Sequence, residues 1–165
     1  MKLAKNLERL GTESAFSILA EAKKLEAQGK EMIHLGLGQP DFKSPKHVVD
    51  AAKKAIDDGH HGYVLANGIL ECRQAVTRKI KNLYNKEISP ERVMIMPGGK
   101  PTMFFAISMI GEPGSEIIHP TPGFPIYESM INYTGAKAVP YDLTEDKDLK
   151  FDPEKILSLI TDKTR

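Results

Sequence analysis

The second half of the chain alternates short apolar segments with helical patterns, and this alternation limits the fold more than any other feature. Short apolar runs predict strands, whereas apolar residues at helical spacing predict helices. The predicted strands are 93–96, 116–118 and 137–141. The predicted helices are 101–110, 124–133 and one that begins at Asp152-Pro153. This order is typical of an α/β fold with a mostly parallel sheet.

The first half of the sequence predicts helices joined by polar loops. They are Glu13 to Ala27, a helix that begins at Ser44-Pro45, and 69–83. Ser44 suits the N-cap of the second helix and Pro45 its first turn. The side chains that follow at helical spacing are expected to form its buried face. They are Val48, Val49, Ala52 and Ile56.

The last predicted helix is followed by the polar segment 161–165. The pattern calls for a further strand there, because parallel strands need neighbours and covering helices. An unfinished sheet edge would expose unpaired backbone groups. We therefore expect the chain to be the first part of a longer domain. The alternative is a three-stranded domain with a natural end at Arg165.

Composition and charge exclude several classes of function for this protein. Lysine and arginine total 23 against 22 aspartates and glutamates, a formal net charge of +1. This balance argues against a nucleic-acid-binding protein, which usually has a basic excess. Cys72 is the only cysteine, so neither an internal disulfide nor a cysteine-rich metal site can form. The N-terminus lacks the apolar run of a signal peptide and no segment is long enough for a membrane span, so a cytoplasmic protein is expected.

The turn Gly98-Gly99-Lys100 between a predicted strand and helix is a candidate phosphate site. Glycines allow a close approach of the backbone, and the helix N-terminus offers N–H groups and a positive dipole end. Met94 and Pro101 stand where a P-loop needs glycine and serine or threonine, so a P-loop is rejected. A plain strand-to-helix turn remains the alternative.

The proline-rich segment 120–127 follows the next predicted strand and would hold the ring of Phe124 near a ligand. Ligands of open α/β sheets bind outside the carboxyl ends of the strands, and an aromatic face can stack on a planar heterocycle. The alternative is that Phe124 belongs to the core. The five histidines and the acidic residues show no spacing that predicts a metal site.

Together these segments resemble the class I and II aminotransferases of the aspartate aminotransferase superfamily, whose cofactor is pyridoxal 5'-phosphate. The similarity extends from about Ser14 to Arg165 and rests on four motifs in the order of the family. They are the substrate loop 33–42, the pattern Tyr63, Gly68 and Arg73 with Cys72 in place of a leucine, the phosphate turn Gly98-Gly99-Lys100, and the aromatic loop 122–127.

The resemblance implies a role for each matching position. Gly38 would donate its backbone N–H to the α-carboxylate of the substrate. Gly99 and Lys100 would bind the cofactor phosphate through their backbone N–H groups. Phe124 would stack on the pyridine ring, and Tyr63 would reach the phosphate of the partner subunit in a homodimer with shared active sites.

The resemblance also implies parts that lie beyond Arg165. These are the asparagine and aspartate that hold the cofactor ring, the Schiff-base lysine and the carboxylate-binding arginine. No catalytic residue is therefore expected in this chain, which should be inactive by itself. The implied fold is an incomplete three-layer αβα sandwich. Residues 1–44 would form an N-terminal arm and small-domain segment, and residues 45–165 the first part of the cofactor-binding large domain.

The implied activity is the transfer of an amino group between an amino acid and a 2-oxo acid. A pyridoxal-phosphate-dependent C–S lyase or synthase on the same scaffold is one alternative, because fold does not decide reaction. A non-catalytic domain that binds a phosphorylated ligand is another.

Overall fold

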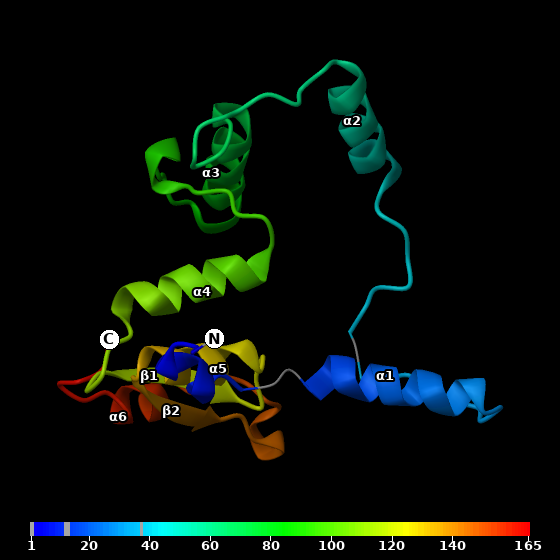
Figure 1. The fold of residues 1–165 in the computed structure, drawn as a ribbon. Helices are drawn as coiled ribbons and strands as arrows, with labels where there is room; N and C mark the ends of the chain where they lie inside the picture. Colours follow the sequence, from blue (N-terminus) through cyan, green and yellow to red (C-terminus); the bar gives the residue numbers. More distant parts are fainter. Residues whose placement is uncertain (1, 12–13, 37) are drawn as a thin grey trace. The chain divides into compact units, whose positions relative to one another are not determined.

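The chain divides into two compact units (Figure 1). The computed structural model describes residues 2–11, 14–36 and 38–165. The first unit, here called the strand unit, comprises Met1–Gly36 and Gly98–Arg165, and the second, the helical unit, comprises Leu37–Pro97. In the part of the chain so described, no helix has the length and apolar character needed to cross a membrane.

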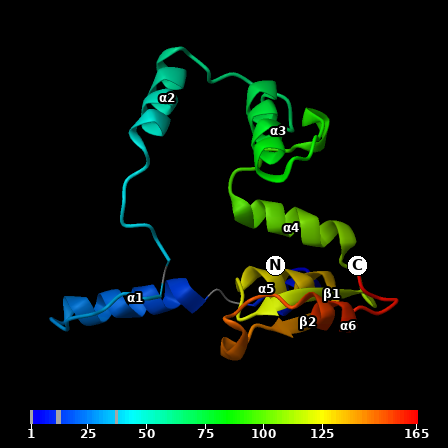
Figure 2. The same cartoon turned by 180° about the vertical axis from the view of Figure 1, so that it is seen from behind.

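The strand unit is built on two parallel strands, β1 (Glu116–Thr121) and β2 (Lys137–Asp142). Their register runs from Glu116 opposite Lys137 to Thr121 opposite Asp142. Parallel neighbours need a crossover connection, and α5 (Ile126–Thr134) supplies it (Figure 2). The predicted α/β alternation is confirmed for this β1–α5–β2 segment.

The core of the strand unit joins α5 to α4 (Gly99–Ile110) and to the sheet. Its most buried members are Ile107, Met130, Ile131 and Ala136. Apolar residues on both strands pack against this cluster. Gly135 ends α5 in the left-handed conformation, with φ 88°, which a glycine adopts without a steric penalty.

Four further elements belong to the strand unit. They are η1 (Lys5–Arg9), α1 (Ser14–Ala27), η3 (Glu145–Lys147) and α6 (Pro153–Ser158). The predicted start of α6 is confirmed, because the side chain of Asp152 accepts hydrogen bonds from the backbone N–H groups of Glu154 and Lys155. The N–H of Asp152 donates to the hydroxyl of Tyr141 over 2.6 Å, which ties α6 to β2.

The prediction of a strand at 93–96 is wrong. A strand requires a neighbouring strand for its backbone hydrogen bonds, and in this segment Ile95 donates instead to the carbonyl of Asn67 over 3.1 Å.

The edge of β1 that does not pair with β2 contacts the last residues of the chain. The N–H of Glu116 donates to the carbonyl of Lys163, and the carbonyl of Glu116 accepts from Arg165. A parallel bridge between Glu116 and Thr164 therefore lies where the further strand after α6 is expected.

The helical unit contains α2 (Lys46–Asp57), α3 (Leu70–Tyr84) and the short η2 (Pro90–Arg92). The predicted N-cap of α2 is wrong by one residue, because Pro45 occupies that position and no side chain caps the helix. Its predicted buried face is also wrong. Val48, Val49 and Ala52 are exposed, and Ile56 is 77% exposed, since none of the described elements packs on that face.

Arg73 connects α3 to the chain segments on either side of it in the helical unit. Its side chain is only 3% exposed and donates to the carbonyls of Gly68 and Pro90 over 3.2 and 3.1 Å. The same guanidinium lies 3.1 Å from the exposed carboxylate of Glu91. Gly68 has φ +91°, and a Cβ atom there would lie 2.8 Å from the side chain of Ile95. Arg73 and Gly68 thus join the loop before α3 to the segment after it.

Replacing Arg73 by methionine should destabilise the helical unit by about 2 kcal/mol, because two backbone carbonyls lose a buried donor. Glu91→Gln is the matched control. It removes only an exposed ion-pair partner, and it should cost less than about 1 kcal/mol. Urea unfolding monitored by circular dichroism measures both changes. Equal losses in the two variants would show that the ion pair matters and the carbonyl contacts do not.

The carboxylate of Glu116 lies at the start of β1 between two donors. It accepts a hydrogen bond from the hydroxyl of Thr161 over 2.7 Å and another from the ammonium of Lys137 over 3.0 Å. These two hydrogen bonds lower the pKa of Glu116 below its ordinary value of 4.5, and the bond from Thr161 has the larger effect. The ionised form therefore ties the end of the chain to the sheet.

A lowered pKa makes the stabilising effect of Glu116 depend on pH in a defined direction. The contribution is present above the unfolded-state pKa and is lost as the pH falls through the lower pKa of the folded state. A carbon-detected NMR titration should place the pKa of Glu116 below 4.5, and Thr161→Val should raise it more than Lys137→Met does. An unchanged pKa in Thr161→Val would contradict this assignment.

Candidate functional site

The N-terminus of α4 forms an open backbone turn in the strand unit. Gly98 is the N-cap, with φ 98°, and the helix begins at Gly99, two residues before the predicted start. The hydroxyl of Thr102 donates to the carbonyl of Gly98 over 3.2 Å. A Cβ atom added at Gly98 or Gly99 would meet no other atom within 4 Å. The turn therefore leaves room beside its backbone for a ligand.

The chemistry of this turn favours an anion. The first N–H groups of a helix have no acceptor within the helix, and the helix dipole places partial positive charge at this end. Lys100 adds a full positive charge in the first turn, while Pro101 contributes no N–H. A phosphate group suits such a helix N-terminus.

The loop between β1 and α5 carries the aromatic part of the site. Gly123 lies against the carboxyl end of β1, where a Cβ atom would be 2.3 Å from the carbonyl oxygen of Pro120. Phe124 follows it and is 40% exposed, so it is not a core residue. Its ring meets the ring of Tyr127 edge to face, with centroids 5.9 Å apart. The helix starts at Ile126, two residues after the predicted start.

The structure brings the glycine turn and the aromatic loop together. The ammonium of Lys100 lies 5.8 Å from the centroid of the Phe124 ring, within the range of a cation–π contact. An anion site and an exposed aromatic face thus adjoin each other at the carboxyl end of β1. This combination fits a ligand that has both a phosphate and a planar ring.

Gly38 and Tyr63, the other two predicted site residues, belong to the helical unit. The side chain of Tyr63 is fully exposed, at 110%, and lines a pocket of about 760 Å³ with His60, Gly62 and Glu71. A Cβ atom at Gly38 would meet nothing within 4 Å. The local site within one unit therefore consists of Gly99, Lys100 and Phe124.

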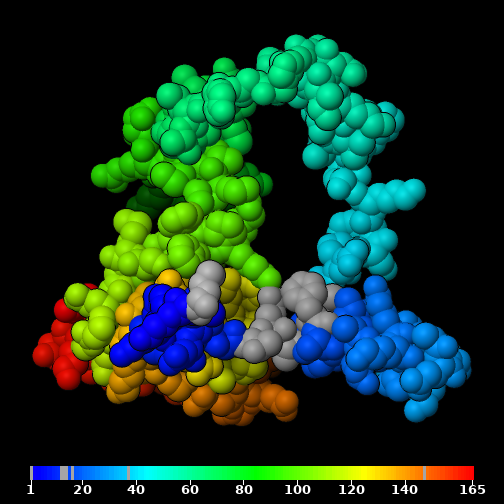
Figure 3. Space-filling view, in the orientation of Figure 1, coloured from blue at the N-terminus to red at the C-terminus, as the bar shows by residue number. Residues whose placement is uncertain are grey.

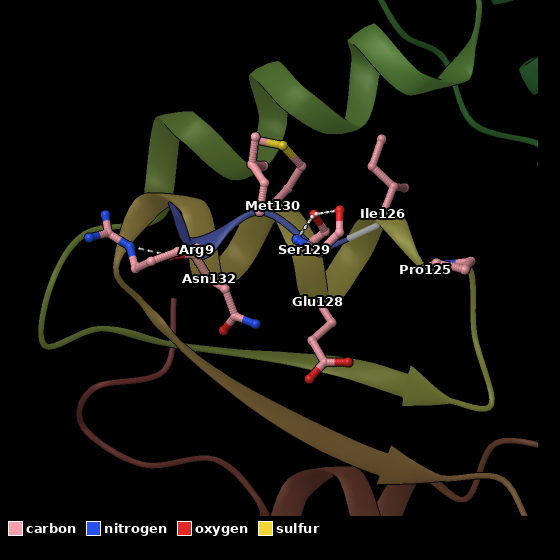
Figure 4. Close-up of a pocket in the computed structure, with 9 residues that line it drawn as sticks. Arg9, Pro125, Ile126, Glu128, Ser129, Met130 and Asn132 are labelled. Atoms are coloured by element: carbon pink, nitrogen blue, oxygen red, sulfur yellow. Dashed lines mark hydrogen bonds between the residues drawn. The ribbon is translucent and has the colours of Figure 1, made fainter. Parts of the chain in front are cut away.

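Sequence reasoning missed a second pocket, which lies beside α5. It has a volume of about 510 Å³ and is lined by N-terminal residues, among them Arg9, and by one face of α5 (Figure 4). Arg9 and Asn132 are 123 positions apart, so no local pattern could reveal their contact. Within the described ranges, no group of three or more histidine, cysteine or acidic side chains could hold a metal ion.

Comparison with protein families gives one match over most of the chain. The family described as aminotransferase class I and II matches residues 30–165. An aspartate aminotransferase of Bacillus subtilis is 33% identical over 165 residues, which is 100% of this chain and 42% of that protein. The (5-formylfuran-3-yl)methyl phosphate transaminase of Methanocaldococcus jannaschii is 36% identical over 163 residues, 99% of this chain and 42% of its own length.

Solved structures give the same result. The aspartate aminotransferase of Thermus thermophilus with maleate superimposes with a TM-score of 0.91 at 28% identity, covering 100% of this chain and 43% of that one. The alanine aminotransferase of Pyrococcus furiosus gives a TM-score of 0.90 at 29% identity, covering 99% and 42%. The chain thus spans about two fifths of the length of the relatives it matches.

Proposed function

The chain belongs to the class I and II aminotransferases, and we propose that it is the amino-terminal part of an enzyme that transfers an amino group between an amino acid and a 2-oxo acid. The family depends on pyridoxal phosphate. The observation that carries the proposal is the adjacency of the turn at Gly99 and the ring of Phe124. When bound, the cofactor supplies an aldehyde that takes up the amino group and a ring that withdraws electrons.

Each candidate residue has a defined task in this proposal. The N–H groups of Gly99 and Lys100 bind the phosphate, and the exposed face of Phe124 stacks on the pyridine ring. Gly38 binds the α-carboxylate of the substrate through its N–H. The exposed ring of Tyr63 reaches the phosphate in a partner subunit. The proposal assigns the proton transfer to none of these residues.

The same proposal covers the organisation of the whole enzyme. Residues 1–44 form an N-terminal arm and part of a small domain, and residues 45–165 begin a three-layer large domain. The enzyme is a cytoplasmic homodimer whose two active sites are shared, as expected for a symmetric assembly. Aspartate is the first amino donor to test, because it is named for the Bacillus subtilis and Thermus thermophilus relatives.

Gly99→Pro should weaken binding of pyridoxal phosphate by about tenfold or more, since it removes one N–H donor to a charged group. Proline is favoured at the first position of a helix, so α4 should be retained. Gly99→Ala is the matched control, because it keeps the N–H and its Cβ enters open space. Absorption titration of the complete enzyme measures both affinities. Equal weakening by alanine would contradict the backbone role.

The proposed activity is tested by cofactor retention and amino transfer. The chain and a longer form that continues past Arg165 are mixed with pyridoxal phosphate, dialysed, and supplied with aspartate and a 2-oxo acid. We expect the longer form to retain the cofactor and transfer the amino group, and the chain alone to transfer none. Release of pyruvate from a cysteine conjugate without an acceptor would favour the C–S lyase. Failure of the longer form to bind the cofactor would favour a non-catalytic domain.

A further inference from the structure

Residues 5–11, the part of the N-terminal arm that is called the arm from here on, lie against α5. In Figure 3 these residues are the blue atoms that pack on other atoms of the strand unit. Arg9 makes the longest-range contacts. Its Nε donates to the carbonyl of Asn132 and its Nη2 to the carbonyl of Tyr133, each over 2.8 Å. Carbonyls in the last turn of a helix have no partner within the helix, and positive charge is favourable at this end. Arg9 therefore caps the C-terminus of α5.

A second contact joins the arm to the first turn of α5. The N–H of Gly11 donates to the hydroxyl of Ser129 over 2.9 Å, and this hydroxyl lies 3.4 Å from the carbonyl of Gly11 (Figure 4). The helix has only nine residues, which is shorter than the roughly 12–15 that an isolated helix needs for marginal stability in water. External contacts must therefore hold α5 in place, and four hydrogen bonds join it to the arm.

The contact at Ser129 leads directly to the aromatic loop. The N–H of Ser129 donates to the carbonyl of Pro125 over 3.3 Å, and the N–H of Tyr127 donates to the carbonyl of Phe124 over 3.0 Å. On the other side, Gly123 is pressed against the carbonyl of Pro120. The backbone of Phe124 is thus set by β1 on one side and by the first turn of α5 on the other.

We propose that the N-terminal arm is a clamp that positions Phe124 for cofactor binding, with Arg9 and Ser129 as positioning residues; this inference rests on the proposed function. Arg9 fixes the far end of α5, and Ser129 fixes the turn from which Phe124 extends. A displaced aromatic ring would stack less well on the cofactor, and small misplacements at a reacting site cost much activity. The arm acts only through α5 and touches neither substrate nor cofactor.

The first test measures the clamp without the cofactor. Hydrogen exchange of the backbone amides of Tyr127 and of residue 129 should become about tenfold faster in Arg9→Met and in Ser129→Ala, because the first turn of α5 opens more often. Lys5→Met is the matched control. It removes a positive charge from the same arm, at a residue that makes none of the described hydrogen bonds to α5, and it should leave both amides unchanged. Unchanged exchange in Arg9→Met and Ser129→Ala, or equal acceleration in Lys5→Met, would overturn the clamp.

The second test uses the complete enzyme with pyridoxal phosphate. Arg9→Met and Ser129→Ala should weaken cofactor affinity by about tenfold and alter the visible circular dichroism of the bound cofactor, which reports the orientation of its ring. A purely structural role would lower stability and leave this spectrum unchanged, which would overturn the positioning role. If the unaltered enzyme retains no cofactor, the proposed function fails, and the exchange experiment still decides whether the arm holds the loop.

Discussion

The parallel pairing of β1 and β2 is the interaction on which the strand unit depends. Two parallel strands can be neighbours only if the chain returns across one face of the sheet, and α5 makes this return. The return buries Met130 and Ile131 against Ile107 of α4. Because Ile107 belongs to this core, α4 is held against the sheet and its first turn lies near the loop that follows β1. The position of the site follows from the crossover, because ligands of such sheets bind at that end.

The glycine turn and the aromatic loop have complementary tasks at this end of the sheet. Gly98 and Gly99 leave space beside the backbone at a helix N-terminus, whereas Gly123 allows a close approach to Pro120. In the proposed function, the first two glycines leave room for the ligand, and Gly123 brings Phe124 toward it. Lys100 connects the two, because its charge lies over the ring of Phe124. The proposed site for an anion and a planar ring is thus formed by two loops of the strand unit that α4 and β1 separate along the chain.

The helical unit depends on a different kind of interaction. Its centre is the buried guanidinium of Arg73, which satisfies two backbone carbonyls from loops on either side of α3. Burial of such a charge is costly unless it is hydrogen-bonded, and the partners of Arg73 meet this requirement. Tyr63 precedes this cross-linked region and is fully exposed.

The sequence by itself determined the elements and the candidate residues whose signals are local. The alternation of apolar runs and helical patterns predicted β1, α5, β2 and α6, and the motifs around Gly99, Phe124 and Tyr63 predicted the family. Tertiary structure decided what depends on partners far away in the chain. It left 93–96 without a neighbouring strand and the apolar face of α2 exposed, and it placed Arg9 on α5. Burial and strand pairing each require two surfaces that come together. A local sequence pattern describes one of these surfaces and does not say which other part of the chain will cover it.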